Sequence, residues 1–138
     1  MRVLLAALAV LFANAAVAQD FPNRAIRIVV GFPAGSGPDI VARLAAQWLT
    51  ERLSQQFVVD NRPGAGSNLA TEAAARAAPD GYTMRMTVAT NTVNATLYDN
   101  LKFDFLRDIA PVTCMAGTAY IMAVTPSLPA KTGPEFVA

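Results

Sequence analysis

The sequence has 138 residues, a formal net charge of +1, no histidine and a single cysteine, Cys114. Without histidine the chain has no Ser–His or Cys–His nucleophile pair and no imidazole metal ligand, so we expect a protein that is not an enzyme and needs no metal or cofactor. Positive and negative side chains are scattered along the sequence rather than clustered. A nucleic acid partner is therefore not expected.

The first 18 residues have the features of a secretory signal peptide. Arg2 is followed by an apolar run in residues 3–13, and then by Ala16 and Ala18 in the Ala-x-Ala arrangement after which signal peptidases cut. The apolar run is shorter than the roughly 20 residues that a helix needs to cross a bilayer. We therefore expect residues 1–18 to be removed and the exported chain to begin at Gln19.

Beyond the signal peptide, strand-like and helix-like segments alternate. Residues 25–32 form an apolar, β-branched run typical of a covered strand, and residues 39–53 have apolar side chains at helical spacing. A second strand is predicted in residues 56–61, an alanine-rich helix in residues 67–78, and a third strand in residues 80–90. This order predicts an α/β fold with a mainly parallel sheet and flanking helices. The predicted apolar face of the first helix consists of Ile40, Leu44, Trp48 and Leu49.

The remainder of the sequence is less regular. Residues 91–112 contain helical fragments and turns, and the apolar run in residues 119–126 predicts a fourth strand. Cys114 lies in an apolar segment, which favours a buried, structural thiol. Thr132 and Glu135 have the spacing of a capping box that begins a helix, and the sequence ends in the first turns of that helix. We therefore expect the chain to be the N-terminal part of a longer protein.

The connection "GFPAGSGPD", residues 31–39, is the main candidate binding site. Its glycines lack the spacing of a dinucleotide-binding fingerprint, and it has no lysine as in a P-loop. Backbone N–H groups at a helix N-terminus, beyond the carboxyl end of a parallel strand, suit a small anion such as a carboxylate. The alternative is a well-capped connection that holds nothing. Asp39 would either balance the helix dipole or accept a hydrogen bond from a ligand.

Four blocks of the sequence resemble the tripartite tricarboxylate transporter receptor family, the Bug or TctC-type periplasmic solute-binding proteins. These blocks are residues 21–53, 58–83, 94–113 and 124–138. They carry a Phe-Pro-x-Gly-x-Gly-x-Asp loop, an Asn-Arg-Pro-Gly-Ala-Gly turn and a Pro-Asp-Gly-Tyr-Thr corner in the family's order and spacing. The resemblance therefore extends from Phe21 to the end of the sequence.

The resemblance implies a periplasmic binding protein-like fold of type II, with two α/β lobes that close on a ligand, here truncated before the second lobe. Residues 19–138 would be the incomplete N-terminal part of that solute-binding domain. The protein would capture a small organic acid in the periplasm and deliver it to integral membrane permease subunits. The alternative is a truncated fragment of such a receptor that binds no solute.

The resemblance also implies that the loops after the first and third strands grip a carboxylate of the ligand. The implied ligand-binding residues are Phe32, Pro33, Ala34, Gly35, Ser36, Gly37 and Asp39 in the first loop, and Thr90, Asn91, Thr92 and Asn94 in the second.

Two departures from the family pattern affect this site. The first loop has Ala34, Ser36 and Pro38 where the family usually has Pro, Gly and Thr, so ligand selectivity would differ. Arg85 interrupts a strand that is normally apolar in relatives. It would be an edge or surface residue, or a charge that loosens the strand.

Overall fold

A computed structural model describes residues 21–119, 121, 123–130 and 132–137 of the chain. The expected signal peptide, residues 1–18, lies outside the described residues. The elements in chain order are β1 (Ile26–Val30), α2 (Gly37–Leu53), β2 (Phe57–Asn61), the 3-10 turn η1 (Ala65–Ser67), α3 (Asn68–Ala75), β3 (Thr83–Met86), α4 (Ala89–Leu97), α5 (Phe105–Asp108) and α6 (Gly133–Val137).

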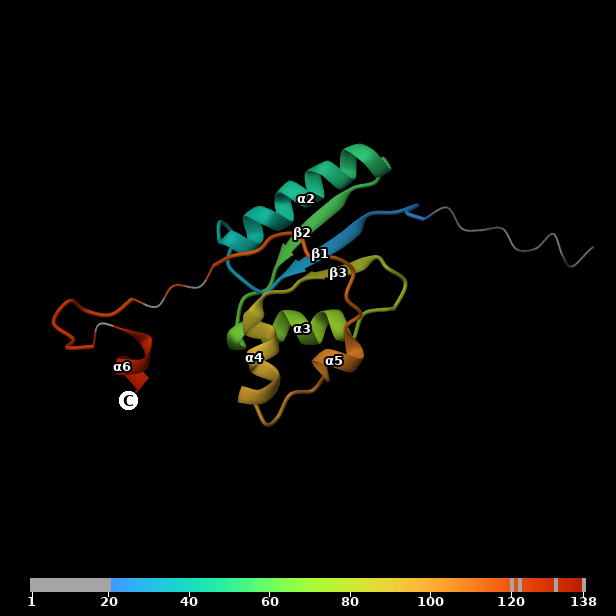
Figure 1. The fold of residues 1–138 in the computed structure, drawn as a ribbon. Helices are drawn as coiled ribbons and strands as arrows, with labels where there is room; N and C mark the ends of the chain where they lie inside the picture. Colours follow the sequence, from blue (N-terminus) through green and yellow to red (C-terminus); the bar gives the residue numbers. More distant parts are fainter. Residues whose placement is uncertain (1–20, 120, 122, 131, 138) are drawn as a thin grey trace, which may run out of the picture.

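The three strands form one parallel sheet in the order β2-β1-β3. The register places Val30, the last residue of β1, opposite Asn61 of β2 and Met86 of β3. The helices α2 and α3 lie on opposite faces of the sheet, with α4 and α5 on the side of α3 (Figure 1). The parallel sheet and the flanking helices predicted from the alternating pattern are therefore confirmed.

One edge of the sheet gathers the carboxyl ends of the strands and the beginnings of the helices. In Figure 1 the arrowheads of β1 and β2 lie at the left of the body, where α2 and α3 begin. This arrangement follows from the parallel topology, because each crossover helix must return the chain to the opposite edge. Loops at this edge are consequently brought close together.

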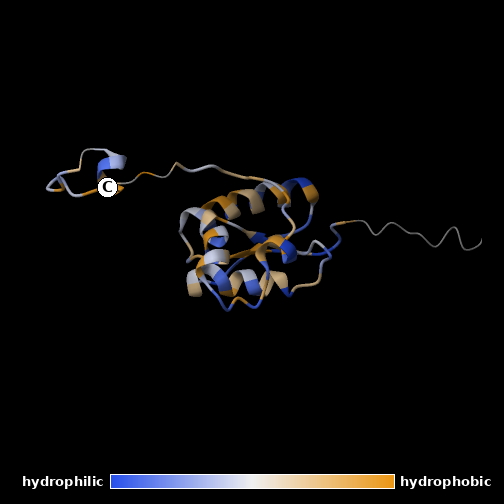
Figure 2. Cartoon of the chain, turned by 60° about the horizontal axis from the view of Figure 1, so that its bottom comes forward, coloured by the Kyte–Doolittle hydropathy of each residue, from blue (hydrophilic) through white to orange (hydrophobic). Residues whose placement is uncertain are grey.

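The main core lies between the sheet and α2. It consists of Ile26, Ile28, Val30, Ala42, Ala46 and Phe57, with Leu49 and Phe32 packed against it. Figure 2 shows hydrophobic segments running through the middle of the body. Side chains alternate along β1, so Ile26, Ile28 and Val30 point toward α2. Val29, which is also fully buried, faces the other side of the sheet.

The predicted apolar face of α2 is mostly wrong. Ile40, Leu44 and Trp48 are about half exposed, at 51%, 64% and 53%, and only Leu49 packs against the core. The helix instead turns its small residues, Ala42 and Ala46, toward the sheet, because small side chains allow the helix to pack closely on it. The prediction was based on the large apolar side chains of α2, and most of these lie on the face that points away from the sheet.

Two expectations for the C-terminal part are also wrong. No strand forms at residues 119, 121 and 123–126, the described part of the predicted fourth strand, and Ile121 is 88% exposed. A strand needs a neighbour for its backbone hydrogen bonds, and this segment runs away from the sheet (Figure 1). Cys114 is exposed rather than buried.

The helix start predicted near the end of the chain is present. Helix α6 follows Thr132, whose Oγ1 accepts a hydrogen bond from the Glu135 N–H at 3.4 Å. This is one half of the predicted capping box. None of the helices in the described ranges is long and apolar enough to cross a membrane.

Candidate functional site

The loop between β1 and α2 folds into a tight turn. The Ser36 N–H donates to the Pro33 carbonyl at 3.2 Å, and Gly35 has a φ of 83°, which only glycine adopts readily. Pro33, Ala34, Gly35 and Gly37 are exposed, while Phe32 is half-buried against the core. The loop therefore presents its backbone, rather than large side chains, at the carboxyl edge of the sheet.

The buried side chain of Asp39 anchors this loop. It is 1% exposed, and its carboxylate accepts hydrogen bonds from the Gly35 N–H (2.8 Å), the Arg43 Nε (2.9 Å) and the Asn61 Nδ2 (2.8 Å). The bond from the Arg43 guanidinium, followed by those from Gly35 and Asn61, holds the pKa of Asp39 well below its usual range. Asp39 is therefore a carboxylate at neutral pH, and both of its oxygens are occupied within the protein.

Asn61 ties the same loop to the end of the neighbouring strand. Its Nδ2 also donates to the Phe32 carbonyl at 3.0 Å, and its Oδ1 accepts from the Arg43 Nη2 at 3.0 Å. Asp39, Arg43 and Asn61 thus form a network that holds both ends of the turn. We call these three residues the brace.

The groups left open at the loop lie at the first turn of α2. The first helical hydrogen bond runs from the Ile40 N–H to the Ser36 carbonyl, so the N–H groups of Gly37 and Asp39 precede it. A Cβ added at Gly37 would meet no atom of the described chain within 4 Å. The Ser36 Oγ is buried and has no hydrogen-bond partner among the described residues. The Gly37 and Asp39 N–H groups and the buried Ser36 hydroxyl therefore have no partner in the described chain, and open space lies beside Gly37.

The second predicted group lies in a helix rather than a loop. Thr90, Asn91, Thr92 and Asn94 all belong to α4, which begins at Ala89. Thr90 and Thr92 are exposed, whereas Asn91 and Asn94 are buried at 2% and 3%.

The two buried asparagines attach α4 to the preceding turn and helix. The Asn91 Oδ1 accepts from the Val88 N–H at 3.1 Å, and its Nδ2 donates to the Thr71 Oγ1 at 3.3 Å. The Asn94 Nδ2 donates to the Gly66 carbonyl and to the Asn68 Oδ1. Buried amides with several partners act here as packing contacts between elements.

A buried polar cluster, consisting of Ser67, Thr71, Arg85 and Asn91, joins the two predicted groups. Arg85 donates to Ser67 and Thr71, and Thr71 accepts from Asn91. Ser67 also lies directly against Gly31, at the start of the first loop, where a Cβ would clash with its Oγ. Among the described residues, no hydrogen bond joins the first loop to α4 directly, so this cluster connects them.

Some of the hydrogen-bonded residues that the sequence analysis did not predict have recognisable features in the sequence. Arg43 lies four residues after Asp39 in a helix, the spacing of a side-chain pair, and Asn61 ends a strand next to β1. Ser67 and Thr71 offered no such signal. Arg85 lies on β3, an edge strand of the described sheet, yet it is half-buried and hydrogen-bonded rather than a surface residue.

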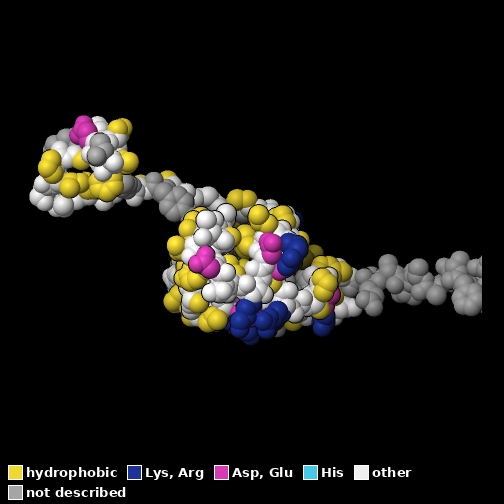
Figure 3. All heavy atoms as spheres, turned by 90° about the horizontal axis from the view of Figure 1, so that it is seen from below, with side chains coloured by type: hydrophobic (Ala, Val, Ile, Leu, Met, Phe, Trp, Pro, Cys, Tyr) yellow, Lys and Arg dark blue, Asp and Glu magenta, His cyan; other side chains and the backbone are white. Residues whose placement is uncertain are grey.

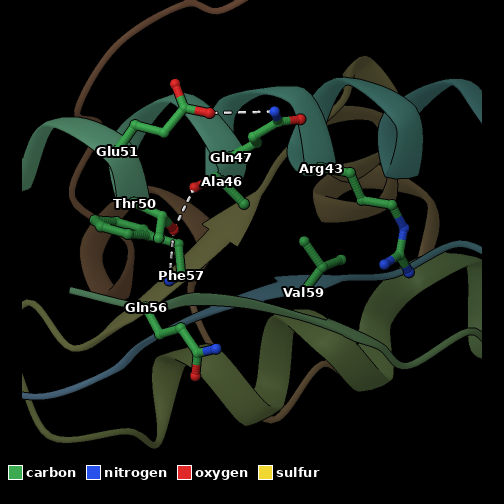
Figure 4. A pocket seen from close by; sticks show the side chains of 8 residues that line it. All are labelled: Arg43, Ala46, Gln47, Thr50, Glu51, Gln56, Phe57 and Val59. Atoms are coloured by element: carbon green, nitrogen blue, oxygen red, sulfur yellow. Dashed lines mark hydrogen bonds between the residues drawn. The ribbon is translucent and has the colours of Figure 1, made fainter. Parts of the chain in front are cut away.

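Two hollows of the surface lie elsewhere. One, of about 420 Å³, runs between α2 and the outer edge of β2 and is lined by Arg43, Ala46, Gln47, Thr50, Glu51, Gln56, Phe57 and Val59 (Figure 4). Most of its polar side chains bond within the protein, as in the Gln47–Glu51 and Thr50–Phe57 pairs. The other, of about 450 Å³, lies between α4 and α5. Neither includes the loop after β1.

On the side of α3, α4 and α5, the described residues form no extended basic area. Figure 3 shows that charged side chains on this face form separate small groups among hydrophobic and uncharged atoms. In the described part of the chain, no group of three or more His, Cys, Asp or Glu side chains could hold a metal ion.

Comparison with known proteins identifies relatives of this chain. The family model described as "Tripartite tricarboxylate transporter family receptor" matches residues 41–138. A UPF0065 protein of Bordetella pertussis is 37% identical over 128 residues, which cover 91% of this chain and 39% of that protein. Protein BugT of the same organism is 33% identical over 132 residues, which cover 91% and 40%. The chain thus spans about 40% of the length of these relatives.

Solved structures agree with this relationship. The structure "R. palustris Rpa4515 with adipate" has a TM-score of 0.68 and 34% identity, covering 86% of this chain and 40% of that one. "MatC (Rpa3494) from Rhodopseudomonas palustris with bound malate" has a TM-score of 0.65 and 34% identity, covering 69% and 33%. The fold is that of part of these periplasmic binding proteins, and the chain belongs to the tripartite tricarboxylate transporter receptor family.

Proposed function

We propose that the chain forms the carboxylate-binding part of an extracytoplasmic solute receptor of the tripartite tricarboxylate transporter type. The receptor captures a small carboxylated metabolite and delivers it to integral membrane permease subunits. In this proposal residues 1–18 direct export to the periplasm, and residues 19–138 are the N-terminal part of the solute-binding domain. Its role is capture rather than catalysis.

The observation that carries the proposal is the loop after β1, with donors that the protein itself leaves unused. The brace holds the turn from inside, while the Gly37 and Asp39 N–H groups and the buried Ser36 Oγ have no hydrogen-bond partner among the described residues. Backbone donors at a helix N-terminus match a carboxylate in charge and geometry. Two similar structures carry adipate and malate, which are both dicarboxylates.

The proposal divides the predicted ligand-binding residues into two roles. Ser36, Gly37 and the backbone N–H of Asp39 contact the acid, together with the exposed Thr90 and Thr92. Phe32, Pro33, Ala34 and Gly35 shape the turn, and the Asp39 side chain braces it. Asn91 and Asn94 position α4.

A substitution at Gly37 tests this proposal. A valine side chain there meets open space in the chain itself, so any loss of binding reflects obstruction of the ligand rather than a clash within the protein. We expect Gly37→Val to abolish binding of malate and adipate by calorimetric titration. Gly117→Val is the matched control, because a Cβ at Gly117 also meets nothing within 4 Å.

Two results would count against the proposal. If Gly37→Val binds the acids as tightly as the unchanged chain, the loop is only a connection between a strand and a helix. If the unchanged chain binds no dicarboxylate, the non-binding alternative is favoured. Export is tested separately, because N-terminal sequencing of the secreted product should begin at Gln19 and not at Met1.

A further inference from the structure

Arg85 is a partly buried cation without an acidic partner in the described part of the chain. Among the described residues, the ion pairs engage Asp39, Asp60, Glu72, Asp80 and Asp108, each with an arginine other than Arg85. Burial lowers the pKa of Arg85 to about 10, so the guanidinium remains charged at neutral pH. Charges removed from water are ordinarily paired, because the loss of hydration is costly.

The guanidinium is held firmly, but by neutral oxygens. Nε donates to the Thr71 Oγ1 at 3.0 Å, Nη1 to the Met86 carbonyl at 3.2 Å, and Nη2 to the Ser67 carbonyl and Oγ at 3.1 and 2.6 Å. These bonds fix its position without neutralising its charge. Ser67 and Thr71 are themselves 2% and 0% exposed, so the guanidinium is oriented by a rigid environment.

The position of this cation relates it to the candidate site. Arg85 is the penultimate residue of β3, at the carboxyl edge of the sheet, and its partner Ser67 touches Gly31 at the start of the first loop. Its other partner, Thr71, binds Asn91 in the first turn of α4. The charge therefore lies at the junction between the two groups of residues that the proposed function assigns to the acid.

We propose that Arg85 is a specificity-determining residue of this site and supplies the positive charge that balances a carboxylate ligand. This inference rests on the proposed function, since it assigns a cation to the same site. It explains why this position on β3 carries a charge that has no acidic partner among the described residues. It also predicts that the site selects ionised acids over neutral molecules of the same shape.

The experiment compares two substitutions of Arg85 in the full chain. Arg85→Gln removes the charge but keeps an amide donor toward Ser67 and Thr71, whereas Arg85→Lys keeps the charge without the planar fork. Arg76→Gln is the matched control, because it removes an exposed arginine from the end of α3. Binding of malate and of its neutral diamide is measured by calorimetric titration, and folding by circular dichroism.

The proposal predicts that Arg85→Gln weakens malate binding about tenfold or more, as expected for losing a charged partner. Arg85→Lys should retain most of the affinity, and Arg76→Gln should leave it unchanged. Equal malate affinity in the unchanged chain and in folded Arg85→Gln would overturn the inference and leave the proposed function standing. Equal losses in the Gln and Lys variants would overturn it too, because charge would then not be the cause.

A second measurement needs no substitution and applies if Arg85→Gln fails to fold. The unchanged chain should prefer malate to its diamide, and this preference should decrease as NaCl is added, because salt screens the charge. Equal binding of malate and the diamide would overturn the inference and would also count against recognition of a carboxylate by the loop after β1. A preference for malate that NaCl leaves unchanged would overturn the inference alone. Binding of neither compound would count against the proposed function and the inference with it.

Discussion

Replacing Asn61 by alanine should loosen the loop after β1, because it removes the link between that loop and β2. The side chain donates to the buried Asp39 carboxylate at 2.8 Å and to the Phe32 carbonyl at 3.0 Å. The first bond involves a charged acceptor and contributes about 1.5 to 3 kcal/mol, and the second about 0.5 to 1.5 kcal/mol. The bond from Arg43 lies at the surface and adds little.

Asn61→Ala should therefore lower the free energy of unfolding by about 2 to 4.5 kcal/mol in urea titrations. Asn100→Ala is the matched control, because Asn100 is exposed and makes no side-chain hydrogen bond with the described chain, so its change should stay within about 0.5 kcal/mol.

A second readout is local to the loop. The Gly35 N–H, which donates to Asp39, should exchange with solvent faster in Asn61→Ala than in the unchanged chain. If both the stability and the Gly35 exchange rate match those of the Asn100→Ala control, the brace does not hold the loop and the reasoning is refuted.

Three further predictions concern the same edge of the sheet and the C-terminal segment. Hydrogen bonds lower the pKa of Asp39, so its contribution to stability should be complete above the unfolded pKa of about 3.9 and be lost as the pH falls from there through the folded pKa. In acid titrations followed by circular dichroism, the stabilities of the unchanged chain and of Asp39→Asn should therefore become equal only at low pH. Equal stabilities near neutral pH would contradict this. Gly31→Ala should destabilise the chain by about 1 to 3 kcal/mol, because the new Cβ would clash with the Ser67 Oγ. Gly133→Ala is the control, because a Cβ there meets open space and should cause no such clash. Equal urea midpoints for the two variants would show that the contact between Gly31 and Ser67 is not tight. The Cys114 thiol should react with a thiol reagent in the native chain as fast as in urea, since it is exposed, and protection in the native chain would restore the buried alternative.

The sequence was informative about the sheet because parallel strands covered on both faces read as continuous apolar runs. Ile26, Ile28 and Val30 belong to such a run, and the interleaved helices imposed the crossover topology. The inner face of α2 was not predictable in the same way. Ala42 and Ala46 are weakly hydrophobic, whereas Ile40, Leu44 and Trp48 are large and apolar. Hydrophobicity alone therefore predicted the wrong buried face of the helix.

The loop after β1 lies at the carboxyl edge of the sheet, as expected from the sequence, and its binding of a ligand stays a prediction. The pattern did not reveal that the Asp39 carboxylate is occupied by Gly35, Arg43 and Asn61, because Asn61 is distant in the sequence. The edge position expected for Arg85 is confirmed, but its hydrogen bonds were not predicted, for a related reason. Its partners Ser67 and Thr71 come from a turn and a helix that meet β3 only in the folded chain.

The most direct test of the central claim is a titration of the isotopically labelled chain with adipate, followed by amide chemical shifts. If the loop after β1 holds a carboxylate through its backbone, the Gly37 and Asp39 amides should show the largest saturable shifts, and the neutral diamide of adipate should not reproduce them. Absence of saturable shifts at these two amides, or equal shifts with the diamide, would contradict the account.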